Sequence, residues 1–288
     1  MGLEIGQEEE PFIGSEALAG GHLTRYELRR YYRAIMPNVY LDKRVEPSLR
    51  QRTFAAWLWS RRQAVIAGSA AAALHGARWV DDETPIELIW PNARAPRGVV
   101  TRDDLLLDGE SQTLHGLTVT TPERTAFDIG RRGGRGRAVP RLDDLAGATH
   151  FKVRNVEELA GKHRHTRGLR RLEAVLHLVD AGAQSPKETW LRLLLIDAGF
   201  TPPQTQIPVY GPDGSPRYYL DMGWEAIMLA VEYDGEQHWT NPAQYVWDID
   251  RLDYLRRAGW TVIRVVARHQ PADVIQRVRH AWDAASHR

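Results

Sequence analysis

The chain has 288 residues with 38 Lys and Arg, 37 Asp and Glu, and no Cys. This length exceeds that of most single domains, so we expect two or three domains with cores of their own. The lack of cysteine excludes disulfides and thiolate zinc sites, and no apolar run is long enough to cross a bilayer. The acidic first ten residues lack the features of a signal peptide, so the composition favours a soluble cytoplasmic protein.

The formal net charge of +1 is unevenly distributed along the chain. Residues 185–288 carry 11 basic and 13 acidic side chains, whereas the preceding residues carry 27 basic and 24 acidic ones. Any affinity for nucleic acid is therefore expected to depend on local basic patches in the first two thirds of the chain rather than on a global field.

The first segment, residues 1–48, contains one clear helix signal. Thr24 and Glu27 form a capping box, which predicts a helix over about 25–34. The order Leu-Thr-Arg-x-Glu-Leu and then Asn-Val-Tyr resembles the opening of AbiEi-type antitoxins, which begin with a winged helix-turn-helix. The stretch between this helix and Val39 is too short for a second, recognition helix. The segment is therefore predicted to be either a partial winged helix or a structural start to the next domain.

Residues 49–183 are predicted to form an α+β domain. An alanine-rich helix is predicted between a Ser69 cap and a Gly76 stop, with His75 at its end in a capping or core role. Strands are expected at 85–90, 98–101 and 114–120. The motifs Ser-Ala-Ala-x-x-His-Gly and Val-Thr-Thr-Pro-Glu-Arg-Thr resemble the AbiEi-type scaffold over about residues 20–180. The resemblance implies a bacterial defence or toxin–antitoxin context, with a protein partner, and identifies no catalytic residue.

Two arginine-rich stretches of this domain are predicted to contact DNA. The first is a glycine-rich loop without acidic residues, and the second begins at Lys162. The candidate side chains are Arg131, Arg132, Arg135, Arg137, Arg164 and Arg167. Flexible, acid-free loops of this kind are suited to following a phosphate backbone. The alternative is that both stretches are solvated connections between helices.

Residues 184–288 alternate between helix and strand signals. Ser185 caps a helix that runs to about 198, and a hairpin of strands 205–210 and 217–221 follows. A buried strand over 226–231 leads into Glu232, Tyr233 and Asp234. A helix over 239–257, a strand over 261–266 parallel to the buried strand, and a helix over 272–280 complete the region. The predicted fold is α/β, a mixed sheet with helices on both faces.

Three carboxylates are predicted to meet at one end of this sheet. Side chains alternate along a strand, so Glu232 and Asp234 share one face while Tyr233 takes the other, and the hairpin brings Asp221 beside Glu232. Clustered acids repel one another unless a cation lies between them. Oxygen ligands without thiolates suit Mg²⁺ or Mn²⁺, which promote phosphodiester hydrolysis. The alternative is a set of solvated charges at strand ends.

The same residues carry a resemblance to a nuclease family. Asp221, then Glu232-x-Asp234-Gly235-x-x-His238, then a helix with Arg251 and a Gly-Trp-x-Val-x-Arg strand, is similar to the endonuclease-like domains related to very-short-patch repair (Vsr) endonucleases. These belong to the PD-(D/E)XK superfamily, and the similarity covers about residues 185–288. It implies a restriction-endonuclease-like fold. One departure is that the superfamily's lysine, two residues after the acid, is replaced here by Asp234.

The resemblance suggests a role for each candidate. Asp221 would be the principal metal ligand, joined by Glu232 or Asp234 and by the Tyr233 carbonyl, and His238 would hold or deprotonate the attacking water. The two remaining candidates, Arg251 and Glu188, each have two interpretations. Arg251 would contact the scissile phosphate or pair with an acid. Glu188 has a complete explanation as a capping-box residue, but related nuclease domains place an early glutamate against the metal.

The sequence thus predicts a metal-dependent DNA endonuclease, using Mg²⁺ or Mn²⁺, whose first two thirds bind DNA or a protein partner. The alternative is a DNA-binding regulator or antitoxin-like protein in which the nuclease fold has lost catalysis. The missing lysine favours this alternative, and the presence of Asp221, Glu232 and His238 favours the enzyme.

Overall fold

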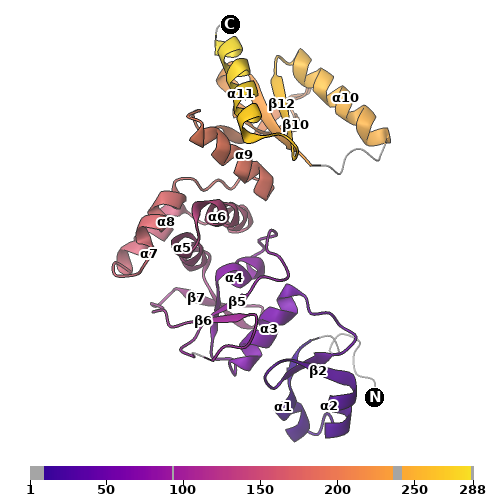
Figure 1. Cartoon of the computed structure of the whole chain (residues 1–288), viewed down its shortest axis with the longest axis vertical. Coiled ribbons are helices and arrows are strands. Elements are labelled where there is room, and N and C mark those ends of the chain that lie inside the picture. Colours follow the sequence, from indigo (N-terminus) through magenta and orange to yellow (C-terminus); the bar gives the residue numbers. More distant parts are fainter. Residues whose placement is uncertain (1–9, 93, 236–241, 287–288) are drawn as a thin grey trace. The chain divides into compact units, whose positions relative to one another are not determined.

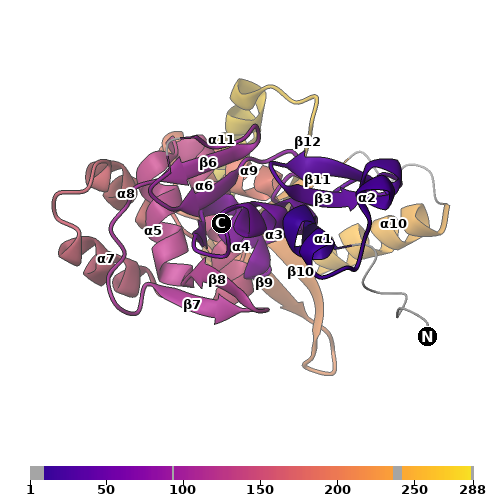
Figure 2. The same ribbon diagram turned by 90° about the horizontal axis from the view of Figure 1, so that it is seen from below.

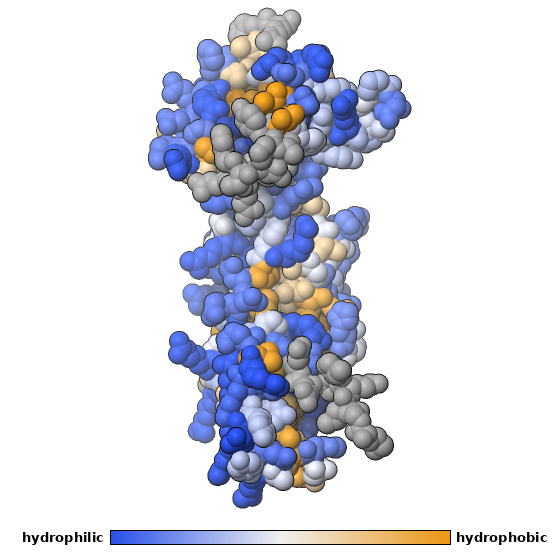
Figure 3. Space-filling model, turned by 90° about the vertical axis from the view of Figure 1, so that its right-hand side faces the viewer, coloured by the Kyte–Doolittle hydropathy of each residue, from blue (hydrophilic) through white to orange (hydrophobic). Residues whose placement is uncertain are grey.

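The computed structural model describes residues 10–92, 94–235 and 242–286 (Figure 1). The chain forms two compact units, Met1–Val179 and Asp180–Arg288. Both units combine helices with mixed or antiparallel sheets, which confirms the predicted α/β class. Hydrophilic residues cover most of the face seen in Figure 3, where apolar residues form small separate groups. Every helix in the described residues is too short or too polar to traverse a bilayer.

The first part of unit 1 places two short helices beside a small sheet (Figures 1 and 2). Its elements are β1 (Phe12–Ile13), α1 (Gly14–Ala19), α2 (Arg25–Tyr31), β2 (Tyr32–Met36) and β3 (Val39–Asp42). β3 pairs antiparallel with both other strands, so the sheet order is β1-β3-β2. A helix, a turn, a second helix and a hairpin follow one another in the order of a winged helix-turn-helix.

The boundaries of α2 follow from its caps. The Thr24 hydroxyl accepts a hydrogen bond from the Glu27 amide (3.2 Å) and the Glu27 carboxylate accepts one from the Thr24 amide (2.7 Å), which confirms the predicted capping box. The helix ends at Tyr31, earlier than predicted, because Tyr32 joins β2 and the Lys43 ammonium binds the carbonyls of the last turn. A basic group is favourable at that end of a helix.

The hairpin between β2 and β3 is anchored on α1. Pro37 and Asn38 form its two-residue turn, and Asn38 adopts a φ of 62°, as the second central residue of a type II turn requires. The Asn38 carbonyl accepts from the Gly14 amide (2.9 Å), and its side-chain oxygen accepts from the Ser15 amide (3.1 Å). These bonds fix the tip of the hairpin to the start of α1.

The rest of unit 1 is a five-stranded mixed sheet, in the described residues, with a layer of helices. The strands are β4 (Val65–Ala67), β5 (Ile86–Ile89), β6 (Val99–Arg102), β7 (Ser111–Leu114) and β8 (Leu117–Thr120), in the order β6-β5-β4-β8-β7. The helices are α3 (Leu49–Trp59), α4 (Gly68–Leu74), α5 (Pro122–Arg132), α6 (Arg135–Thr149), α7 (Val153–Lys162) and α8 (Leu169–Leu176). Ile66, Leu88 and Val119 are fully buried on adjacent strands, and Ile13 and Met36 belong to the same core cluster. The first part of unit 1 therefore shares a core with the sheet.

Unit 2 is a four-stranded sheet, in the described residues, with helices on both faces. The strands β9 (Gln204–Tyr210), β10 (Pro216–Trp224), β11 (Leu229–Asp234) and β12 (Thr261–Val266) have the order β12-β11-β10-β9. β9 and β10 form the predicted hairpin, and β12 runs parallel to β11 as predicted, after the helix α10 (Pro242–Arg257).

Alternate residues of β11 separate the two faces of this sheet. Val231 packs in one cluster with residues of α9 (Pro186–Asp197) and α11 (Pro271–Ser286), whereas Ala230 packs with Leu255 of α10. The prediction of helices on both faces is therefore confirmed. The buried strand begins later than the predicted 226–231, because Glu225–Ile227 form a 3₁₀ turn (η1) and Met228 has a φ of 50°.

Candidate functional site

The exposed face of α2 gathers basic and aromatic side chains. Arg25, Tyr26, Arg29 and Arg30 line a surface hollow of about 390 Å³, and Tyr26 is 66% exposed. The Arg30 guanidinium lies 5.9 Å from the centre of the Tyr26 ring and 5.7 Å from that of Tyr31. Within the described part of the chain, no carboxylate forms an ion pair with these three arginines.

This arrangement is unfavourable for an isolated helix. Arg25 and Arg29 are four residues apart, so their like charges are neighbours on one side of α2. The only acid of the helix, Glu27, is engaged by Thr24, whose backbone amide holds the pKa of this carboxyl below its ordinary value. The α2 face therefore offers several uncompensated positive charges and a stacking ring to an anionic partner.

We did not predict the α2 face from the sequence, because α1 was overlooked. The Thr24 helix is the second helix of the pair rather than the first. The available signal was the stretch Ser15–Ala19, which has helix-forming residues and is followed by Gly20 and Gly21. Gly21 adopts a φ of 68°, as expected at a helix end.

The predicted flexible arginine loop is wrong. Arg131 and Arg132 end α5, and Arg135 and Arg137 lie in the first turn of α6. Arg131 is buried, and its guanidinium lies 2.9 Å from carboxylate oxygens of both Asp104 and Asp128.

Arg132 has acidic partners as well. Its guanidinium lies 3.1 Å from Glu87 and from Asp128, and also contacts Asp104. Glu87 and Asp104 are distant in the sequence, so their ion pairs could not be predicted from the arginine run, whereas Asp128 lies only three and four residues before these arginines. Arg131 and Arg132 are committed inside the fold and do not form a free DNA-contacting loop.

The other arginines predicted to contact DNA are in different surroundings. Arg137, Arg164 and Arg167 are exposed, whereas Arg135 is half-buried and engaged in a contact within the fold. The Arg164 guanidinium donates to the Gly161 carbonyl (3.1 Å). Their contact with DNA stays a prediction.

A buried charge network explains the Thr-Pro-Glu-Arg-Thr motif. Arg124 is 1% exposed and pairs with Glu110 and with Asp128 (3.0 Å), and its guanidinium also binds the Leu105 carbonyl (2.8 Å). The His163 ring nitrogen lies 2.6 Å from the other Glu110 oxygen. Arg124 of the motif therefore holds α5, the segment between β6 and β7, and the end of α7 together.

His75 behaves as predicted. It caps α4, its Nε2 lies 2.7 Å from the Thr120 carbonyl, and burial lowers the pKa of its imidazole, which favours the neutral form. A structural role is sufficient to explain it.

The carboxylates of unit 2 line a second hollow, of about 390 Å³. Pairing between β10 and β11 extends only to Met222 and Val231. Beyond that point the Asp221 carboxylate accepts a hydrogen bond from the Tyr233 amide (2.9 Å) in place of a backbone carbonyl. Asp221, Glu232 and Asp234 all line this hollow.

Two of the three predicted metal ligands are paired with arginines. Arg251 of α10 binds both oxygens of Glu232, one at 2.9 Å, and also donates to the Tyr219 carbonyl (3.1 Å). Of the two interpretations of Arg251, the structure therefore has the acid pair. Asp234 pairs with Arg264 of β12. An arginine that binds a carboxylate through two parallel hydrogen bonds occupies the oxygens that a metal ion would use.

Asp221 is the acid of this hollow that lacks an arginine pair. Burial and the nearby charges of Glu188 and Glu232 raise the pKa of Asp221 to about 7, against the opposing effects of the Tyr233 amide and Arg251. The site therefore retains an excess of negative charge that a proton, or a cation, would relieve.

Glu188 lies at the start of α9, close enough to act on Asp221. Its carboxylate accepts from the Gln184 amide (2.9 Å), its own amide donates to the Ser185 hydroxyl (3.1 Å), and burial raises the pKa of this acid. The Glu188 carboxylate therefore binds the turn before α9 and its charge acts on Asp221, and its position against a metal ion stays a prediction.

The described residues do not by themselves complete a metal site. Within 10–92, 94–235 and 242–286, no three His, Asp or Glu side chains are arranged so that they could hold a metal ion. His238 lies outside the described residues. The Mg²⁺ or Mn²⁺ site formed by Asp221, Glu232 and Asp234 stays a prediction.

Comparison with known proteins concerns unit 1 most directly. Residues 63–181 match the family model of the AbiEi antitoxin C-terminal domain. This AbiEi-like region extends from β4 to the end of α8 and contains both motifs that suggested the resemblance, as well as the buried Arg124 network.

Longer but weaker similarities extend beyond the AbiEi-like region. Two curated proteins of Mycobacterium tuberculosis, the uncharacterized proteins MT2308 (strain CDC 1551 / Oshkosh) and Rv2248 (strain H37Rv), are each 28% identical over 243 residues, 83% of this chain and 89% of the relative. The crystal structure of the Rv2827c protein from Mycobacterium tuberculosis aligns with a TM-score of 0.40 and 20% identity, over 72% of this chain and 85% of that one.

Proposed function

We propose that the protein is a DNA-binding regulator of the antitoxin type. The exposed, acid-free arginine face of α2, the second helix of a helix-turn-helix, is the observation that carries the proposal. The match of residues 63–181 to an antitoxin domain supports it independently. In this proposal α2 contacts DNA and the AbiEi-like region binds a protein partner of the toxin class.

The geometry of α2 suits a DNA groove. A second helix of this kind enters the major groove, where arginines bind phosphates and the edges of guanines. Arg25 and Arg29 project from one side of the helix, and Tyr26 adds an exposed ring between them in sequence. The turn of the β2–β3 hairpin, at Pro37 and Asn38, would contact the backbone beside the groove.

Fluorescence anisotropy with duplex DNA tests this proposal. A duplex is first selected from a random-sequence library by the full chain, and the double variant Arg25→Ala/Arg29→Ala is then compared with wild type. We expect the affinity to fall about tenfold to a hundredfold, because two charge-assisted contacts are lost. Arg154→Ala is the matched control, since Arg154 is exposed and pairs only locally with Glu158. Equal affinities for the double variant and wild type would refute the assignment of α2.

The carboxylate hollow supports a second candidate, a metal-dependent DNA endonuclease. The convergence of Asp221, Glu232 and Asp234 in one hollow is the observation that favours it, and burial together with two neighbouring acids raises the pKa of Asp221 to about 7. Asp221, Glu232 and Asp234 would hold Mg²⁺ or Mn²⁺, which would supply Lewis acidity and a nucleophilic water. Glu232 and Asp234 would first have to release Arg251 and Arg264.

Cleavage of supercoiled plasmid distinguishes the two candidates. The plasmid is incubated with the protein and Mg²⁺ or Mn²⁺, with and without chelator, and in parallel with Asp221→Asn. Cut products that disappear with chelator and with the variant would establish the enzyme. Intact plasmid that is nevertheless bound, with an affinity that falls as salt rises, is the result expected for the regulator.

A further inference from the structure

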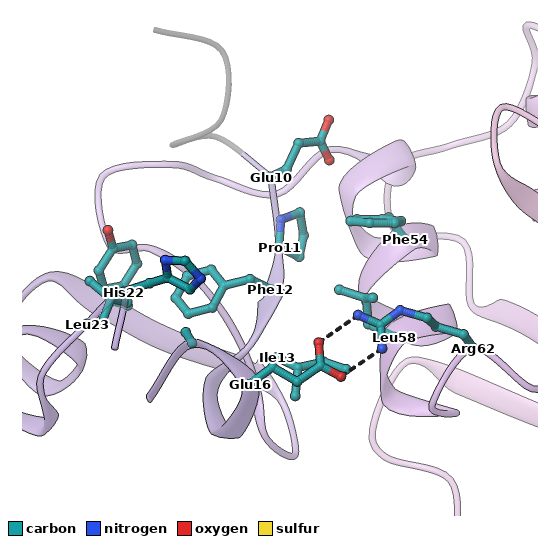
Figure 4. Close-up of a pocket in the computed structure, with 12 residues that line it drawn as sticks. Glu10, Pro11, Phe12, Ile13, Glu16, His22, Leu23, Phe54, Leu58 and Arg62 are labelled. Atoms are coloured by element: carbon teal, nitrogen blue, oxygen red, sulfur yellow. Dashed lines mark hydrogen bonds and ion pairs between the residues drawn. The ribbon is translucent and has the colours of Figure 1, made fainter. Parts of the chain in front are cut away.

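An apolar pocket of about 560 Å³ lies between the helix-turn-helix and α3 (Figure 4). Its walls consist mainly of half-buried apolar side chains, with rings contributed from three elements. The principal wall residues are Phe12, Ile13, Leu23, Tyr32, Phe54 and Leu58. Phe12 and His22 line one side, and Phe54 and Leu58 line the opposite side. This volume and an apolar lining with few polar groups are typical of small-molecule sites.

A single ion pair closes one end of the pocket. Arg62, after α3, binds both oxygens of Glu16 on α1, at 2.8 and 2.7 Å. A second hollow of about 560 Å³ shares Glu16, Arg62 and two apolar residues with the first one. The ion pair therefore connects α1 to the end of α3 and separates the two hollows.

The backbone that carries Arg62 is in an unusual conformation. Arg61 and Arg62 have φ values of 57° and 65°, although neither is glycine. Their amides donate to the Leu58 carbonyl (2.9 Å) and the Trp57 carbonyl (3.0 Å), which hold the turn in place. These two bonds are those of a Schellman C-cap, so the left-handed turn is the end of α3 and fixes the position of Arg62.

The charges around the pocket define the class of ligand. Glu16 and Arg62 neutralise each other, and Glu10 at the rim pairs with Arg50. A charged ligand would have to break one of these pairs, whereas an uncharged one would keep both. The rings and the rim imidazole of His22 instead favour a flat molecule with one hydrogen-bonding group.

The pocket also touches both ends of α2. His22 and Leu23 immediately precede its N-cap, Thr24, and Tyr32 immediately follows its last residue. A molecule that fills the space between these residues and α3 would change how α2 is held. A conformational effect of this kind requires only that the ligand prefer one arrangement over another.

We propose that this pocket is an effector site for a small, uncharged, ring-containing molecule, whose binding changes the affinity of α2 for DNA. The regulatory half of this statement rests on the proposed DNA-binding function. Binding of the small molecule to the pocket does not depend on that function and is measured separately.

The probe is N-phenyl-1-naphthylamine, an uncharged compound with a naphthyl and a phenyl group, whose fluorescence rises in apolar surroundings. The full chain is titrated as wild type, as Ala17→Trp, which places a large ring in the pocket, and as Phe54→Ala, which removes one wall. Ala19→Trp is the matched control, because Ala19 is exposed on the same helix and does not line the pocket. We expect Ala17→Trp and Phe54→Ala each to weaken binding about tenfold or more, and Ala19→Trp to bind as wild type does.

The DNA-binding half uses the same proteins. Saturating probe should change the affinity of wild type for duplex DNA about fivefold or more and leave that of Ala17→Trp unchanged. No saturable binding by wild type, or equal binding by all four proteins, would overturn the proposal. Saturable, pocket-dependent binding without an effect on DNA affinity would remove the regulatory half. A wild type that does not bind DNA at all would contradict the proposed function and leave the probe result standing.

Discussion

Arginines at two places in unit 1 have opposite surroundings. On α2, Arg25 and Arg29 are exposed and have no acidic partner in the described part of the chain. At α5, Arg124 and Arg131 are buried and share Asp128. The residue type is the same, and the presence of a buried carboxylate decides between a structural and a binding role.

Unit 2 adds a third situation. There Arg251 pairs with Glu232 and Arg264 pairs with Asp234. A nuclease would need these two acids as metal ligands, so the ion pairs oppose a catalytic role for them. Among the described acids of the carboxylate hollow, Asp221 is left without such a pair, and its pKa is raised to about 7. A set of acids is therefore informative only together with the cations that the fold brings to it.

The largest effect is expected at the buried network. Asp128→Ala leaves Arg124 and Arg131 without their shared carboxylate, so the free energy of unfolding of unit 1 should fall by about 3–5 kcal/mol. Chemical denaturation of the full chain, followed by circular dichroism, measures it. Glu158→Ala removes an exposed ion pair with Arg154 and should change stability by less than about 0.5 kcal/mol. If Asp128→Ala and Glu158→Ala lowered the free energy of unfolding equally, the claim that buried arginine pairs stabilise the fold more than exposed ones would be wrong.

A smaller effect, with a defined pH dependence, is expected at Asp221. Its folded pKa of about 7 lies above the ordinary value, so the folded state binds the proton more tightly than the unfolded state does. The contribution of protonated Asp221 to the free energy of unfolding is fully present below about pH 4 and is lost as the pH rises through 7.

Asp221→Asn tests this pH dependence directly, because the asparagine side chain does not ionise and its variant should not lose this stability as the pH rises. At pH 8 the variant should unfold with a free energy about 2 kcal/mol higher than wild type, and the difference should shrink towards pH 4. Denaturation curves between pH 4 and 8 provide the measurement. If Asp221→Asn instead lowered the free energy of unfolding at pH 8, the Asp221 carboxylate would be stabilised by its partners in the folded protein, and the predicted pH dependence would be wrong.

The cap of α2 provides the smallest of these effects on stability. Thr24→Ala removes the hydroxyl that accepts from Glu27 and should cost about 1 kcal/mol. Because the capped turn also carries Arg25, DNA affinity should fall in parallel. Thr149→Ala is a suitable control, since the Thr149 hydroxyl bonds only locally at the end of α6, to the Leu145 carbonyl and the Phe151 amide. If Thr24→Ala lowered stability but kept the wild-type affinity for DNA, the expected link between the α2 cap and DNA binding would be wrong.

Much of the fold could be predicted from local signals. The capping box at Thr24, the N-cap at Ser185, the hairpin leading to Asp221 and the parallel strand after α10 all follow from signals in the local sequence. The partners of the charged residues could not be predicted in this way. Glu87 and Asp104 reach Arg132 only through the sheet of unit 1, and Arg251 reaches Glu232 only because α10 crosses that face.

The salt dependence of DNA binding tests the central claim most directly. The logarithm of the association constant is measured against the logarithm of salt concentration for wild type, for Arg25→Ala/Arg29→Ala, and for Arg164→Ala/Arg167→Ala. If α2 is the DNA-contacting element, the slope should become shallower by about two in the α2 double variant and stay at the wild-type value in the other. An unchanged slope in the α2 variant, or a loss confined to Arg164 and Arg167, would contradict the account.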